Sequence, residues 1–223
     1  MMKKITVKCF GFWLCFVVCV SGAVDQYVEV KSGLCIPQRR CSVHYKNAPC
    51  FSAEWGLRWE AWRLGLQMGY VKYEIKRTDG GEDGAMWSTI FNPENGYFEN
   101  LRFSTFSVMA NVYRDWQVCD ETTLYVGCGL GMARLNYRFT DKQDIFEKGE
   151  GFVFNQDKYL FAAQLMCGIS HELNDHWSVS LGYRCMKTEN VKYNVLVENA
   201  EEVFRSLRTP FLHSLEVGLR YSF

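Results

Sequence analysis

The chain has 223 residues, of which 48% are apolar and 16% aromatic, and its 25 basic residues are balanced by 25 acidic ones. The length allows one or two domains, the neutral balance argues against a nucleic-acid binder, which would carry a basic surplus, and the apolar content excludes a disordered chain. Ten cysteines are typical of a small disulfide-rich protein, but the length and the aromatic content argue against that class.

Residues 1–23 have the pattern of a secretory signal peptide. Three lysines in the first eight residues precede an apolar run over 9–20, and Ser21 and Ala23 place small side chains at the −3 and −1 positions of a cleavage site. The alternative is a transmembrane anchor, but the run is shorter than the about 20 residues that span a bilayer. Cleavage after Ala23 leaves one domain over 24–223, with 22 basic and 25 acidic residues and seven cysteines.

Beyond residue 24 the apolar residues recur with period two in segments of about ten residues, which is the period of a β-strand. In the last segment, both charged residues, Glu216 and Arg220, fall on one face. The pattern predicts eight strands, near 26–36, 53–62, 64–74, 102–114, 124–132, 161–169, 177–186 and 213–223. Phe103 is out of phase with Phe106, so we expect a bulge near Ser104.

The connections between these segments alternate strictly in length. Three are short, around Trp62-Arg63, 115–121 and Asn174-Asp175, and four are long, at 37–52, 75–100, 137–158 and 188–210. All long loops therefore emerge at one end of the sheet and all short turns at the other. This predicts an all-β protein, an eight-stranded antiparallel up-and-down barrel.

The two faces of the predicted strands differ in kind. Glycines inside the regular strands all fall on the polar face; they are Gly33, Gly56, Gly65, Gly69, Gly127, Gly129, Gly131, Gly168, Gly182 and Gly218. A surface strand gains nothing from glycine, whereas the inside of a narrow eight-stranded barrel needs small side chains. The other face is continuous and uncharged, which suits lipid. We therefore predict a transmembrane barrel with four long outer loops and three short periplasmic turns; a lipocalin-like or sandwich protein is the alternative.

Aromatic residues lie where membrane interfaces are expected. Trp62, Trp116 and Trp177 lie beside the three short turns, and a second aromatic group, which includes Trp55 and Tyr70, lies towards the long loops. Two such belts match the aromatic girdles of a membrane barrel.

The last two segments carry a family resemblance. The C-terminal sequence Leu-Glu-Val-Gly-Leu-Arg-Tyr-Ser-Phe, which contains Leu219, Tyr221 and Phe223, resembles the terminal signal that the bacterial outer-membrane assembly machinery recognises. The segment 176–184 is similar to the penultimate strand of the opacity-protein and OmpA/OmpX-type small barrels. The resemblance implies a location in the outer membrane of a Gram-negative-type bacterium, with outer-membrane lipid and the assembly machinery as partners. It implies no functional residue, because that superfamily has no shared catalytic motif.

Charged residues on the predicted inner face have mixed signs: Glu29, Lys31, Arg58, Glu60, Arg184, Glu216 and Arg220. Buried charges persist only when they are paired, and Arg184 and Glu216 lie at matching heights on adjacent strands. The pattern therefore predicts an ion-pair network that closes the interior. A charge-selective pore would show one dominant sign; a narrow porin-like channel for small or apolar solutes is the alternative.

An enzyme is the third class of function. His176 and Ser178 have the His-x-Ser spacing of outer-membrane lipid A deacylases, but they lie at the short-turn end and on the inner face, where such an enzyme would not place them. We therefore predict no catalytic residue. Because no Cys-x-x-Cys or histidine-rich spacing is present, we also predict no metal site and no cofactor.

The cysteines and loops complete the prediction. Cys41 and Cys50 bracket part of the first long loop and are candidates for a disulfide, with Cys35 as a competing partner, whereas Cys128, Cys167 and Cys185 fall on the lipid face. The fourth loop contains a segment, 198–208, that could form two or three helical turns. We expect the loops to serve surface interaction, such as adhesion to host or envelope ligands, or envelope integrity.

Overall fold

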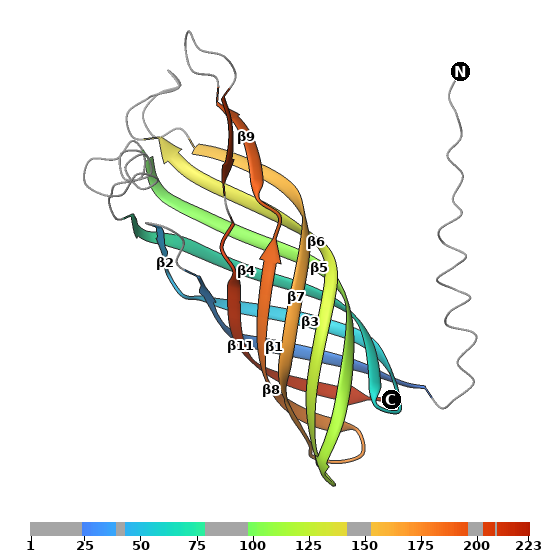
Figure 1. The fold of residues 1–223 in the computed structure, drawn as a ribbon. Coiled ribbons are helices and arrows are strands. Elements are labelled where there is room, and N and C mark those ends of the chain that lie inside the picture. The colour runs from blue at the N-terminus through green and yellow to red at the C-terminus, as the bar shows by residue number, and fades with distance from the viewer. Residues whose placement is uncertain (1–23, 39–42, 79–97, 142–152, 196–202, 208) are drawn as a thin grey trace, which may run out of the picture.

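The computed structural model describes residues 24–38, 43–78, 98–141, 153–195, 203–207 and 209–223 (Figure 1). The predicted signal peptide, 1–23, lies outside these residues. The described strands are β1 (Asp25–Pro37), β2 (Val43–Tyr45), β3 (Ala48–Trp59), β4 (Trp62–Thr78), β5 (Phe98–Cys119), β6 (Thr122–Asp141), β7 (Val153–Glu172), β8 (Trp177–Thr188), β9 (Val191–Val195), β10 (Val203–Leu207) and β11 (Leu212–Ser222). Over the ranges given above, no helix is long and apolar enough to cross a membrane.

Eight of these strands close into the predicted antiparallel barrel. They follow the order β4-β3-β1-β11-β8-β7-β6-β5, and a further pairing of β4 with β5 closes the ring. The seam between the first and last strands pairs Tyr27 with Ser222 and Pro37 with Leu212. Closure removes the free strand edges that would otherwise pair with other chains.

Each predicted segment corresponds to one barrel strand, but several strands are longer than predicted at the long-loop end. β4 continues to Thr78, β5 begins at Phe98, β6 continues to Asp141 and β7 begins at Val153. Polar side chains on neighbouring strands hold this extension together, because Asp157 accepts hydrogen bonds from Arg134 and Asn136 across the β6–β7 pair. β4 to β7 therefore continue past the ends of the other barrel strands, as Figure 1 shows.

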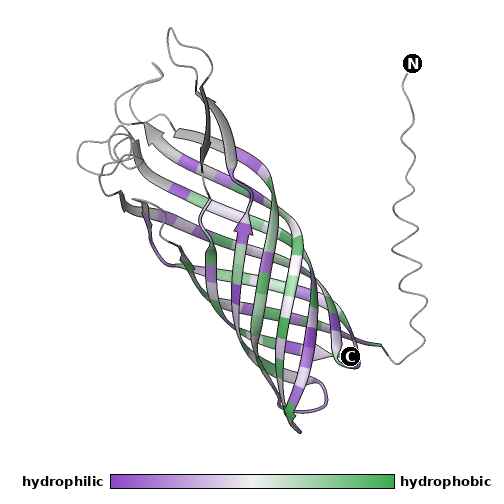
Figure 2. Ribbon diagram, in the orientation of Figure 1, coloured by the Kyte–Doolittle hydropathy of each residue, from purple (hydrophilic) through white to green (hydrophobic). Residues whose placement is uncertain are grey.

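The strands bury one face and expose the other with period two. Along β1 the inner residues are buried, while Val30 on the outer face is 59% exposed, and Val217 on β11 is 61% exposed. Exposed large apolar side chains occur on all eight barrel strands, and Figure 2 shows hydrophobic and hydrophilic residues mixed along these strands, as expected when the two kinds face opposite sides. A water-soluble protein does not expose an apolar surface of this extent, so this face requires an apolar environment.

The inner face is narrow enough to require glycine. A Cβ atom at Gly127 would meet the Tyr113 ring, and a Cβ atom at Gly182 would meet the Tyr125 hydroxyl. The glycines of the inner face therefore make room for tyrosine rings that cross the lumen. This is the packing that a filled eight-stranded barrel needs.

The bulge near Ser104 is a wrong prediction. The β4–β5 register runs without a shift from Trp62 opposite Arg114 to Glu74 opposite Arg102. Phe103 faces the interior and is only 6% exposed, so no bulge is needed to bring it to the outside. The register of β5 with β6 shifts instead between Glu99 and Arg102, and between Gln117 and Cys119.

The helical turns over 198–208 are also a wrong prediction within the described part of that segment. Residues 203–207 form β10, which pairs antiparallel with β9, with Val203 opposite Val195 and Leu207 opposite Val191. Valine, phenylalanine and leucine suit a strand when a partner strand is present, and β9 supplies that partner. The remaining residues of the segment, 198–202 and 208, lie outside the described residues.

Candidate functional site

The candidate site is the interior of the barrel, where Glu29 is the centre of a charge network. Its carboxylate accepts hydrogen bonds from Arg220 Nη2 at 3.2 Å and from Ser180 Oγ at 2.8 Å. Lys31 Nζ forms an ion pair with it at 3.2 Å, and Arg63 Nη1 lies 4.0 Å from it. The Glu29 side chain is fully buried. The structure therefore brings together three of the charges that the sequence places in the lumen.

Arg63 is a lumen residue that the sequence reasoning missed. Its guanidinium donates two hydrogen bonds to Asp115, at 2.8 and 2.9 Å. It also lies over the rings of Tyr113, at 4.6 Å, and Tyr125, at 5.1 Å. The sequence pattern predicts a turn at Arg63. However, Arg63 lies an even number of residues from the inner glycines of β4, so the alternation of that strand indicates that its side chain faces inwards.

Glu54 is a second missed acid, and it sits in a cluster of neutral hydrogen-bond donors. Tyr27 donates to it at 2.7 Å, Tyr113 at 2.5 Å and the Asn111 side-chain amide at 2.8 Å. Gln164 extends the cluster across the lumen by donating to Gln67 and Asn111, at 2.8 and 2.7 Å. These polar side chains come from five strands and cross the lumen beside Glu29, which lies opposite Glu54 in the β1–β3 register.

Arg184 and Glu216, predicted at matching heights, form an ion pair of 2.5 Å between β8 and β11. Both side chains are only 7% exposed. The Cys50 thiol donates to the same carboxylate, with Sγ 3.7 Å from Oε1. This pair lies towards the long-loop end, above the Glu29 network.

Among the side chains that the structure describes, an apolar layer lies towards the long-loop end of the lumen. The Tyr73 and Phe103 rings stack at 5.4 Å, and Tyr45 meets both edge-on, at 5.7 and 6.4 Å. The buried side chains around them are Cys35, Ala48, Cys50, Val71, Leu135, Leu160, Met186 and Leu212. The interior is therefore layered, with charges next to the short turns and an apolar layer next to the long loops.

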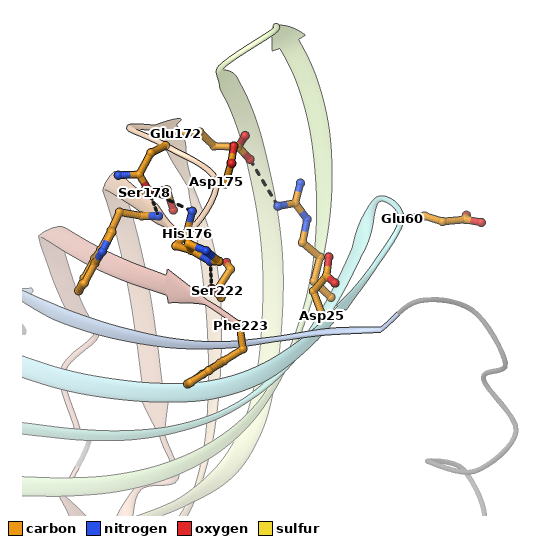
Figure 3. A pocket seen from close by; sticks show the side chains of 11 residues that line it. Asp25, Glu60, Glu172, Asp175, His176, Ser178, Ser222 and Phe223 are labelled. Carbon is orange, nitrogen blue, oxygen red and sulfur yellow. Dashed lines mark hydrogen bonds and ion pairs between the residues drawn. The ribbon is translucent and has the colours of Figure 1, made fainter.

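Two residues of the predicted network do not lie in the lumen. Arg58 lies at the mouth of the barrel, one-third exposed, and pairs with Glu172 at 3.4 Å. Glu60 is exposed in the β3–β4 turn with a φ of 50°, and Figure 3 shows it pointing away from the barrel. The placement of Glu60 in the lumen was wrong because β3 ends at Trp59, so the alternation stops one residue before it.

The mouth at the short-turn end contains a hollow of about 520 Å³ lined by several carboxylates, together with His176 and Ser178 (Figure 3). The His176 Nδ1 atom lies 3.0 Å from the backbone oxygen of Ser222, and its ring stacks on Tyr221 at 5.6 Å. Ser178 is buried on the inner face of β8, opposite Arg220. The imidazole of His176 therefore contacts Ser222 and Tyr221 of the last strand rather than Ser178.

The other predicted sites are placed as follows. The described residues contain no cluster of three or more His, Cys, Asp or Glu side chains able to hold a metal ion. Cys50, expected in the first loop, lies in β3 as a buried free thiol, and Cys41 lies outside the described residues. Cys128 and Cys167 are exposed on the outer face, and Cys185 is half-buried there.

Three tryptophans at the short-turn end face outwards. Trp62, Trp116 and Trp177 are 40 to 48% exposed. Tyr221 meets Trp177 at 4.9 Å and Phe223 at 5.1 Å, both edge-on. Leu219 is also exposed on this face. The geometry suits an interfacial belt, while the role of Leu219, Tyr221 and Phe223 as an assembly signal stays a prediction.

Solved structures share this architecture. The neisserial surface protein A covers 91% of this chain and all of its own, with a TM-score of 0.57 and 12% identity. A major outer membrane protein of Thermus thermophilus gives the same coverage and TM-score at 11% identity, and the outer membrane protein OprG of Pseudomonas aeruginosa gives 0.52 at 12%. The fold is that of the small bacterial outer-membrane barrels. Together with the apolar outer face, this fold locates the protein in a bacterial outer membrane.

Sequence comparisons give relatives without an assigned activity. No family model matches the chain. Uncharacterized proteins of Brucella abortus and Brucella suis are 27% identical to it over 183 residues, which is 72% of this chain. The match spans 63% of the length of these Brucella relatives.

Proposed function

We propose that this outer-membrane barrel is a non-enzymatic scaffold with a closed interior, and that the segments beyond its long-loop end carry its interactions with host or envelope ligands. The observation that supports the closed interior is the pair of stacked layers in the lumen. The charged layer around Glu29 and the apolar layer around Tyr73 lie one above the other, so a solute would have to pass both.

Each layer resists an ion for a different reason. The lower layer has its charges neutralised in pairs, so moving an ion through it means separating Arg63 from Asp115 or Glu29 from Arg220, which leaves a buried charge without a partner. The upper layer presents mainly aliphatic and aromatic surface to an ion, and this surface replaces little of the ion's water shell. Some buried guanidinium atoms, such as Arg184 Nε and Nη1, have no hydrogen-bond partner in the protein, and buried donors of this kind are commonly satisfied by ordered water.

Single-channel recording in planar bilayers tests this closure. We expect no steady ion-sized openings from the wild-type protein. Because the layers act in series, neither the double variant Arg63→Ala with Asp115→Ala nor the double variant Tyr73→Ala with Phe103→Ala should conduct, whereas their combination should. Gel mobility before and after boiling checks that each variant is folded. Steady openings of the wild-type protein would establish the alternative, a narrow channel for small solutes.

A deletion experiment tests the role of the outward segments. Because β4 continues to Thr78 and β5 begins at Phe98, a deletion that spares the barrel must stay within 79–97, and a second one within 196–202. We expect the shortened barrels to assemble and shift on gels as the full chain does, while cells that carry them lose surface attachment or envelope integrity. Unchanged attachment and envelope integrity in the presence of assembled, shortened barrels would contradict this part of the proposal.

A separate experiment tests the proposal that the barrel is not an enzyme. The His176 ring is held by Ser222 and Tyr221, so changing Ser178 to Ala should leave the lipids of the cell envelope unchanged. Loss of a lipid modification in the Ser178→Ala variant would support the lipid-modifying enzyme instead.

A further inference from the structure

The outer face of β4 to β7 changes character towards the long loops. On β4 the outward residues run from Tyr70 to Lys72 and Glu74, and on β6 from Met132 to Arg134 and Asn136. The register places Tyr70, Phe106, Arg134 and Tyr159 in one row across the four strands, and Lys72, Ser104, Asn136 and Asp157 in the next. Charged side chains thus begin directly beside the aromatic belt, where lipid headgroups meet a membrane barrel.

Five cations gather in this region, and we call them the rim cations: Lys46, Lys72, Arg102, Arg134 and Arg138. All five are exposed. Among the described side chains, two carboxylates pair with them: Glu74 pairs with Lys46 at 3.1 Å and Arg102 at 2.8 Å, and Asp157 pairs with Arg134 at 2.6 Å. These described side chains carry a surplus of positive charge in a chain whose total formal charge is zero.

Among the residues that the structure describes, the surplus lies on one side of the barrel. On the neighbouring half, Ile36 of β1 and Pro49 of β3 face outwards at the same end, and Phe211 directly precedes β11. A general attraction to an anionic membrane would be served by cations all around the rim. Their concentration over four adjacent strands instead favours a localised ligand.

An apolar hollow lies on the same face, deeper in the membrane. It measures about 610 Å³ and is floored by the small outward side chains Ala110, Cys128, Ala163 and Cys185, with Leu130 between them. On β6 Leu130 precedes Arg134 by four residues on the same face, which places the hollow roughly 13 Å from that cation along the strand. Lys187 lines the upper side of the hollow, and its ammonium group lies over the Phe211 ring at 5.2 Å.

We propose that the outer face of β4 to β7 binds a phosphorylated, acylated lipid of the outer leaflet, with the phosphate among the rim cations and an acyl chain in the hollow. Arginine guanidinium groups bind phosphate oxygens through two parallel hydrogen bonds, and Arg134 is already oriented by Asp157. Each basic residue near a membrane surface adds attraction to an anionic headgroup. A soluble anion would use the cations alone, whereas the hollow faces hydrocarbon and fits only a chain that lies in the bilayer.

Native mass spectrometry of the detergent-solubilised protein tests the site with dimyristoyl phosphatidic acid as the probe. Dimyristoylglycerol, which has the same chains without the phosphate, and inorganic phosphate, which has no chains, are the comparison ligands. The rim variant changes Lys72, Arg134 and Arg138 to Gln. A matched control changes Arg58 and Arg114 to Gln, because these cations lie at the short-turn end. A groove variant changes Ala110 and Ala163 to Leu, which fills the hollow.

The wild-type protein should retain phosphatidic acid and not dimyristoylglycerol. The rim variant should bind phosphatidic acid at least tenfold more weakly, the groove variant at least threefold more weakly, and the control within twofold of the wild type. All variants should keep the gel shift of a folded barrel, because the changes are on the surface. Equal binding by the rim variant would overturn the proposal, and so would competition by inorganic phosphate at the same concentration as phosphatidic acid, which would identify a simple anion site.

Discussion

Replacing Glu29 with Gln should strongly destabilise the barrel, because this one carboxylate neutralises several buried cations. Arg220 and Lys31 each lie 3.2 Å from it, and both side chains are only 7% exposed. Removing one partner of a buried ion pair costs about 3–5 kcal/mol. We expect the lower end, about 3 kcal/mol, because glutamine can still accept the Ser180 hydrogen bond.

Urea unfolding of the refolded barrel in vesicles, followed by tryptophan fluorescence, measures this loss. With a dependence of about 2 kcal/mol per molar urea, the unfolding midpoint should fall by about 1.5 M. Glu60→Gln is the control, since this glutamate is exposed in a turn and its change should stay within about 0.5 kcal/mol. A second change, Lys31→Met, should recover part of the loss by removing a cation that has no partner. A midpoint for Glu29→Gln that matches that of Glu60→Gln would refute the reasoning.

Three further predictions concern the interior, the rim and the outer face. A Cβ atom at Gly182 would meet the Tyr125 hydroxyl, whereas one at Gly168 would also meet a backbone oxygen. Gly182→Ala should therefore lower the free energy of unfolding by about 1–3 kcal/mol, as measured by urea unfolding. Tyr125→Phe should restore the stability of Gly182→Ala but not that of Gly168→Ala. The hydrogen bond from Lys46, with the nearby charge of Arg102, lowers the pKa of Glu74 below its ordinary 4.5, so its pairing should persist below that pH and be lost only as pH falls through the lowered pKa. In an NMR titration, the titration midpoint of Glu74 should be higher in the Lys46→Met variant than in the wild-type protein. An unchanged midpoint would contradict the assigned role of Lys46. In single-cysteine variants in vesicles, a water-soluble maleimide should label Cys119, whereas Cys167 should react only with a membrane-soluble one; the reverse pattern would contradict the assigned outer face.

The fold was predictable because a barrel in a membrane repeats one rule along the whole chain. Each strand alternates between lipid and lumen, so even a weak period-two pattern, summed over eight segments, defines the strands and their inner face. Two of the failures occur where this rule stops. Glu60 lies one residue past the end of β3, and residues 203–207 lie beyond the membrane, where the pairing of β10 with β9 decides the structure and composition does not.

The interior network was predictable only in part for a similar reason. Parity identifies which residues face inwards, and it correctly places Glu29, Lys31, Arg184, Glu216 and Arg220 there. Which inner residues meet depends on the shear of the closed barrel, which no local pattern records. The inner face also includes Glu54 and Arg63. Glu54 was overlooked although it lies within the predicted strand 53–62, on the same face as Arg58, whereas Arg63 required knowing that the inward alternation extends closer to the turn than the apolar residues indicate.

The position of Glu29 at the seam has a consequence for how the barrel completes its folding. Its partners come from separate parts of the chain: Lys31 from the same strand, Arg63 from β4, Ser180 from β8 and Arg220 from β11. Before the first and last strands join, the carboxylate lacks its nearest guanidinium, so a sheet that stalls before closure holds an acid without its full complement of cations. Contacts between residues so far apart in sequence form late and slowly. We therefore expect the seam to form last. Because its closure also neutralises Glu29 at the centre of the lumen, a partly closed sheet is energetically disfavoured.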